Sequence, residues 1–149
     1  MRTVTALTAA IAFALSLSAC DRAESPAETR EDVAEARRDG SKDVIDARAD
    51  AAKTAIEARE NVAQTYGDDP DDLRDEQADA MRDNAKAAYD VAVAQADATL
   101  QVEQEKCDAV TGDARDACQK RAEAAYESAK ADAQMKLDRT QRLADAHDD

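Results

Sequence analysis

The chain has 149 residues and a formal net charge of −14 at pH 7, from 34 acidic and 20 basic side chains. Aromatic residues make up 3% of it and tryptophan is absent, which excludes an ordinary globular core of large side chains, and the negative charge disfavours nucleic acid as a partner. Such a composition is typical of disorder, but alanine and the other strong helix formers dominate the sequence. We therefore expect an all-α fold with thin, alanine-lined contacts.

The N-terminal stretch MRTVTALTAAIAFALSLSAC has the plan of an export signal. One Arg precedes an apolar run that is too short for a membrane-spanning helix. The run ends in LSAC, which resembles the lipobox of bacterial lipoproteins; in that family the preceding peptide is removed and the cysteine is acylated. Ordinary signal cleavage is the alternative, but it would place Leu17 where a small residue is preferred. We expect a signal peptide at 1–19, lipidation at Cys20 and a tether at 20–24.

The first helix is predicted over residues 26–66. In SPAE, Ser25 is the expected N-cap, Pro26 takes the first helical position and Glu28 completes a capping box. Small and apolar residues then recur with an 11-residue period, which favours straight or slightly right-handed packing. This stripe consists of Val44, Ala47, Ala51, Ala55, Ala58, Val62 and Tyr66. Gly40 and Ser41 are expected to weaken or kink the helix, at a cost of about 1 kcal/mol for the glycine.

The second helix is predicted over residues 70–111. In YGDDPDD, Gly67 stops the first helix, Asp69 caps the second and Pro70 opens it. Two adjacent stripes give this helix a wide apolar face, as a middle helix with two neighbours requires. One stripe is Met81, Ala85, Ala88, Ala92 and Ala96, reaching Cys107 and Val110 but interrupted by Glu103, and the other is Ala87, Val91, Ala98 and Val102. DDPDD could hold a cation weakly, but it lacks the spacing of an EF-hand loop, so capping is the better interpretation.

The third helix is predicted over residues 114–146, with Gly112 as the preceding stop, Asp113 as the N-cap and 147–149 as a frayed tail. Its stripe is Cys118, Ala122, Ala125, Ala129, Ala133 and Leu137. Because both connections are short, neighbouring helices should run antiparallel. The helical domain, residues 25–146, is thus predicted as an elongated, coiled-coil-like antiparallel three-helix bundle or helical hairpin.

Two cysteines remain once Cys20 is assigned to the lipid. Outside the cytoplasm two remaining thiols usually pair, so we expect a disulfide between Cys107 and Cys118 across the second turn. Zinc is an alternative, but it needs about four ligands and the single histidine, His147, lies in the tail. A redox pair would need two intervening residues, and here there are ten.

The segment KCDAVTGDARDAC also resembles a motif of small, alanine-rich exported helical proteins of proteobacteria, sometimes described as TolA-like. Their motif reads approximately K-C-D-x-x-(S/T)-G-(D/N)-A-(K/R)-D-x-C. The resemblance covers about residues 93–134 and implies an envelope location and the disulfide, without implying an activity. The chain departs from that family in its strong acidity, its single motif copy and its lipobox.

No catalytic constellation is visible, and we expect no enzyme, cofactor, metal or small-molecule substrate. The sequence favours a non-enzymatic protein anchored by lipid in the cell membrane or outer membrane and facing the periplasm. There it would serve as a helical spacer, scaffold or protein-interaction element for an unidentified envelope partner. An acidic periplasmic binding or buffering protein for cations or basic partners is the alternative.

Overall fold

The structure is a computed structural model that describes residues 22–67 and 69–148. Within them the chain forms three helices and no strand: α1 (Pro26–Thr65), α2 (Pro70–Cys107) and α3 (Asp113–Asp148). The predicted all-α, elongated antiparallel fold is confirmed. At 1.5 Å per residue, helices of 40, 38 and 36 residues are about 60, 57 and 54 Å long.

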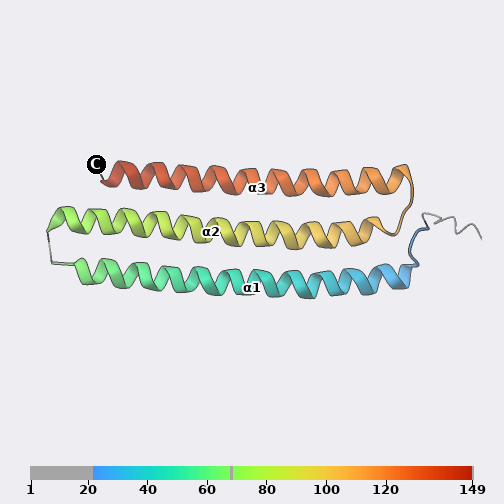
Figure 1. The fold of residues 1–149 in the computed structure, drawn as a ribbon, viewed down its shortest axis with the longest axis horizontal. Coiled ribbons are helices and arrows are strands. Elements are labelled where there is room, and N and C mark those ends of the chain that lie inside the picture. Colours follow the sequence, from blue (N-terminus) through green and yellow to red (C-terminus); the bar gives the residue numbers. More distant parts are fainter. Residues whose placement is uncertain (1–21, 68, 149) are drawn as a thin grey trace, which may run out of the picture.

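The helices lie side by side in one layer, with α2 in the middle (Figure 1). α1 and α3 each pack against α2, but no Cα atom of α1 lies within 8 Å of a Cα atom of α3 in the described residues. The bundle is therefore an open array rather than a closed triangle. α2 carries both contacts, as its two predicted stripes require, and α1 and α3 each keep a free outer edge.

The helix starts follow the predicted capping chemistry at two of three sites. At α1, the Glu28 amide donates to Ser25 Oγ at 3.3 Å and the Ser25 amide donates to Glu28 Oε2 at 2.9 Å. At α2, the Asp71 amide donates to Asp69 Oδ1 at 2.9 Å. α3 differs, because Asp113 is already its first helical residue and the Gly112 carbonyl accepts from the Asp116 amide at 3.1 Å.

The ends of α2 and α3 also differ from the prediction. α2 ends at Cys107, four residues before the predicted end, because the next three amides form tight i to i−3 bonds. The first of these is the Asp108 amide, which donates to the Glu105 carbonyl at 3.2 Å. α3 runs on to Asp148, so His147 belongs to the helix and not to a frayed tail.

The core is a row of small side chains. Its buried hydrophobic members are Ala36, Ala58, Ala78, Ala96, Cys107, Ala122, Ala133 and Ala144. Eleven residues separate successive buried alanines of α3, eleven also separate Ala96 from Cys107, and twice eleven separate Ala36 from Ala58. Because eleven residues make three turns at 3.67 residues per turn, the contacts recur along nearly straight helices. The period predicted for the first helix thus extends to all three.

Gly40 has a different role from the predicted one. α1 continues through it, and the glycine is buried against α2. A Cβ atom at this position would lie 2.5 Å from Ala98 Cβ and 2.9 Å from Ala98 Cα. Gly40 is therefore a contact residue that lets the backbones of α1 and α2 approach closely.

Candidate functional site

The most chemically distinctive part of the molecule is the end where α2 turns into α3. The structure joins Cys107 and Cys118 by a disulfide, with their Cα atoms 5.6 Å apart, within the usual range for such bonds. Cys107 is fully buried at the last residue of α2, and Cys118 lies in the second turn of α3. Gly112, between them, has a φ of +58°, which favours glycine and lets the chain reverse. The disulfide closes the hairpin at one end.

The same end is fastened by Asp108, the residue after α2. An Asp108 carboxylate oxygen lies 2.6 Å from an Arg115 guanidinium nitrogen, which ties the turn to the first turn of α3. The Asp108 carbonyl accepts a hydrogen bond from the Glu24 amide at 2.9 Å. This hydrogen bond between Glu24 and Asp108, called the clip below, joins the segment before α1 to the α2–α3 turn. All three helices are therefore held together at this end.

Carboxylates crowd around this clip. Burial raises the pKa of Glu24, and the nearby charges of Asp32, Asp108 and Glu105 add to the increase. Burial likewise raises the pKa of Glu105, helped by the charges of Asp108, Asp32 and Glu35. A carboxyl group whose pKa is higher in the folded state binds its proton more tightly in that state than in the unfolded chain. The free energy of unfolding therefore falls as the pH rises from the unfolded-state pKa to the folded-state pKa. The clip should be firmest below neutral pH.

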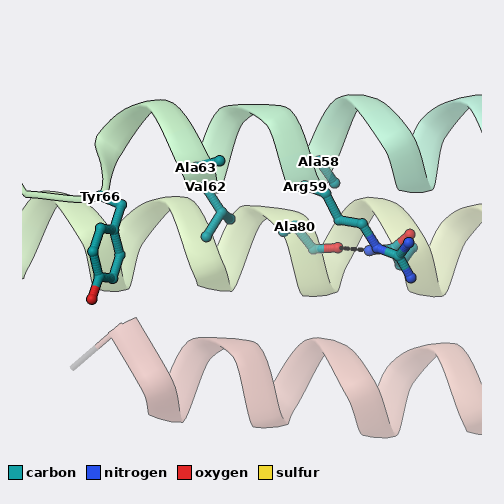
Figure 2. Close-up of a pocket in the computed structure, with 7 residues that line it drawn as sticks. Ala58, Arg59, Val62, Ala63, Tyr66 and Ala80 are labelled. Atoms are coloured by element: carbon teal, nitrogen blue, oxygen red, sulfur yellow. Dashed lines mark hydrogen bonds between the residues drawn. The ribbon is translucent and has the colours of Figure 1, made fainter.

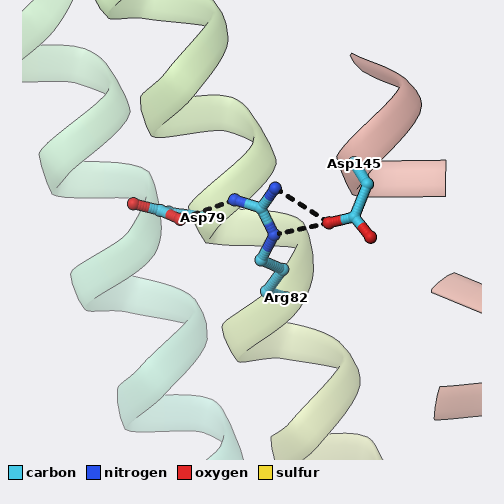
Figure 3. Close-up of polar contacts among 3 residues, drawn as sticks. All are labelled: Asp79, Arg82 and Asp145. Atoms are coloured by element: carbon cyan, nitrogen blue, oxygen red, sulfur yellow. Dashed lines mark hydrogen bonds and ion pairs between the residues drawn. The ribbon is translucent and has the colours of Figure 1, made fainter. Parts of the chain in front are cut away.

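The opposite end is held by an ion pair between Arg82 of α2 and Asp145 of α3, and Arg82 also pairs with Asp79 within α2 (Figure 3). Arg82 donates from Nη2 and Nε to Asp145 Oδ1, at 3.0 Å and 3.3 Å, and from Nη1 to Asp79 Oδ1 at 2.8 Å. Nearby, His147 Nε2 lies 3.0 Å from Gln77 Oε1. These contacts fix the end of α3 that no disulfide secures.

The hollows of the molecule are open grooves between helices. The one in Figure 2, about 510 Å³, lies between the C-terminal part of α1 and the N-terminal part of α2. Its lining residues are Ala58, Arg59, Val62, Ala63, Tyr66, Ala80 and Asn84. The side-chain amide of Asn84 already donates a hydrogen bond to the Ala80 carbonyl, at 2.7 Å. This arrangement suits contact with another surface better than chemistry on a small molecule.

Tyr66 departs from its predicted place in the buried stripe. It lies directly after α1 with extended backbone angles, φ −65° and ψ 113°, so its side chain no longer follows the helical period. The side chain is 81% exposed and stands at the edge of this hollow (Figure 2). Gly67 follows with a φ of +107°, which ends the helix as predicted.

The predicted signal peptide at 1–19 and the predicted lipidation site, Cys20, lie outside the described residues, as does Asp21 of the 20–24 tether. No helix in the described ranges combines the length and apolarity needed to span a membrane. Nor is any group of three or more His, Cys, Asp or Glu side chains within 22–67 and 69–148 arranged to hold a metal ion.

The features that sequence reasoning missed are the role of Gly40, the clip at Glu24 and the ion pairs of Arg82. Gly40 offered a signal, because a glycine within a strong helical pattern often marks close backbone approach. The Glu24–Asp108 hydrogen bond and the Arg82–Asp145 ion pair join residues far apart in sequence, whereas the Arg82–Asp79 pair has the i, i+3 spacing of one helix face. Comparisons with models of protein families, with curated proteins and with solved structures found no match to this chain.

Proposed function

We propose that the chain is a lipid-anchored, non-enzymatic protein of the bacterial envelope, and that its helical layer serves as a spacer or scaffold that other proteins bind. The LSAC motif and the remaining pair of cysteines support the envelope location. The observation that carries the proposal is the open array itself. A layer of three helices about 55–60 Å long, with both faces uncovered by the described chain, offers contact surface along its whole length.

The position of the N-terminal segment fits this function. The proposed anchor, Cys20, lies four residues before Glu24, which is bonded to the α2–α3 turn. An anchor so close to the fastened end would leave the opposite end, with the α1–α2 connection and the end of α3, farthest from the membrane. The layer would then stand off the membrane by up to its length, about 60 Å.

The anchoring step is tested by Cys20→Ser in the full chain. Labelling with radioactive palmitate should disappear, and the protein should leave the membrane fraction or remain as an uncut precursor. Cys118→Ser is the matched control, because its thiol belongs to the disulfide and its loss should leave labelling intact. Palmitate incorporated by the Cys20→Ser protein would refute the proposal.

The spacer role is tested separately, by shape and by ion dependence. Small-angle scattering should give a radius of gyration above the value of about 14 Å expected for a globule of about 130 residues. The melting temperature should not change with calcium. A cation-binding protein would instead gain about 2.7 kcal/mol at a ligand concentration 100 times its dissociation constant. A calcium-dependent rise in melting temperature would favour the binding or buffering function over the spacer.

A further inference from the structure

α1 carries two stripes of small and apolar residues, and only one of them is used. The inner stripe packs against α2. The outer stripe consists of Ala34, Ser41, Ile45, Ala49, Ala52, Ile56 and Ala63, all exposed. Three of its members, Ser41, Ile45 and Ala63, also border open grooves that α1 shares with α2. Ile45 is 60% exposed and Ile56 is 55% exposed, although isoleucine is among the residues most often buried. The two isoleucines are 11 residues apart, which is the same period as the buried contacts.

Charged residues flank this outer stripe in a repeated order. The segments 35–37, 46–48 and 57–59 read Glu-Ala-Arg, Asp-Ala-Arg and Glu-Ala-Arg, with 11 residues from one to the next. Since 11 residues make three turns, the three arginines form one row and the three acids form another. Acid and arginine are two positions apart, about 200° around the helix, so the rows lie on opposite flanks.

The structure agrees with this placement. Arg37 lines a groove with Ala98 of α2, whereas Glu35 lines a different groove with Gln101 and Glu105. All six charged side chains of the two rows are exposed. Arg37, Arg48 and Arg59 have no ion-pair partner among the described residues. Both rows are exposed and follow the same axial repeat as the apolar stripe between them, and within the acidic row Glu57 also pairs with Lys53 of its own helix, at 3.7 Å.

We propose that the outer stripe of α1 binds a second copy of this chain, with the two α1 helices parallel and related by a twofold axis along their length. In this arrangement the arginine row of each copy faces the acidic row of the other, on both sides of the stripe. Arg48 then lies opposite the partner copy's position 46, offset by about 3 Å along the axis, which a long side chain spans easily. Ile45 and Ile56 each face their own counterparts.

The charge pattern selects this arrangement over others. In an antiparallel pair each flank meets the same flank of its partner, so arginines would face arginines and acids would face acids. α1 has 10 acidic and 7 basic residues, α2 has 10 and 4, and α3 has 8 and 7, so the largest excess of negative charge, −6, lies on α2. α2 is displaced from the partner copy by one further helix spacing of about 8–10 Å. At physiological ionic strength charges are largely screened beyond about 8 Å. A membrane surface is a less suitable partner for the outer stripe than a second copy of the chain. Helices that lie on membranes carry bulky Trp, Phe or Leu residues on their apolar face, whereas alanine makes up most of this stripe.

Site-specific crosslinking of the full chain in cells tests the interface. Ile45→Cys and Ile56→Cys should each form disulfide-linked dimers with themselves under mild oxidation, since a parallel pair places identical positions together. Met135→Cys on the outer edge of α3 is the matched control, because Met135 is also 60% exposed, and it should stay monomeric. Self-crosslinking at one isoleucine position only, equal crosslinking at Met135→Cys, or attachment to another protein or to lipid would overturn the proposal.

Charge exchange tests the pairing of the rows. Replacing all three arginines by Glu should give a monomer in sedimentation analysis, and so should replacing the three acids of the facing row by Arg. Mixing the two variants in equal amounts should restore a dimer, because every pair of facing rows is then complementary again. Circular dichroism should show equal helicity throughout. A monomeric wild-type chain at tens of micromolar, or a mixture that stays monomeric, would refute the pairing.

Discussion

Gly40→Ala sets two effects of known size against each other. Alanine is favoured over glycine inside a helix by about 1 kcal/mol. The new methyl group, however, would lie 2.5 Å from Ala98 Cβ, whereas carbon atoms pack at about 3.8 Å, so the helices must separate locally by about 1.3 Å. Overpacking of this kind costs about 1–3 kcal/mol. We expect a net loss of up to about 2 kcal/mol in the free energy of unfolding, measured by urea denaturation.

Two controls separate the effects. Ala124→Gly, at an exposed position of α3 outside the proposed interface, should cost about 1 kcal/mol through helix propensity alone. Ala98→Gly combined with Gly40→Ala should recover part of the loss, because the Ala98 Cβ is removed but its Cα stays 2.9 Å from the new methyl group. The double-mutant cycle then gives the coupling energy between the two positions. If Gly40→Ala alone stabilised the protein by the full 1 kcal/mol, α1 and α2 could not approach each other as closely as described.

Three further predictions concern the two fastened ends. Cys118→Ala should lower the free energy of unfolding by about 2–4 kcal/mol, because the loop that Cys107 and Cys118 close is then unconstrained in the unfolded chain. A reducing agent should lower the melting temperature of the wild type but not that of the variant. Glu105→Gln should raise the melting temperature at pH 7, since the carboxyl pKa of Glu105 is raised in the folded state and its charge is unfavourable there. The variant should also gain less stability than the wild type as the pH falls below neutral; an equal pH dependence in the two proteins would contradict the crowding of carboxylates around Glu24. Arg82→Ala should cost about 0.5–1 kcal/mol and speed amide hydrogen exchange at the C-terminal end of α3, with no change near the disulfide.

Local chemistry made most of the fold predictable. Ser25 and Asp69 cap helices because their side chains reach amides two or three residues away, and Gly67 ends a helix because it tolerates a positive φ. Such signals lie within a few residues of their effects. The helix starts were therefore predicted to within one residue.

Other features depended on contacts that a single sequence does not reveal. The end of α2 at Cys107 follows from the tight turn that joins it to α3, and the burial of Gly40 follows from the position of Ala98. The clip between Glu24 and Asp108 joins residues 84 positions apart. Cys20 lies outside the described residues, so its lipidation stays a prediction.

The absence of contact between α1 and α3 in the described residues gives the molecule a linear order of stability. Each outer helix is held by one interface, so α1 can detach while the disulfide-closed pair of α2 and α3 stays intact. Repeat proteins behave in this way, because the energy of each unit depends only on its neighbours. Thermal fluctuations should accordingly open the layer from the α1 side, with α2 the last helix to lose its hydrogen bonds.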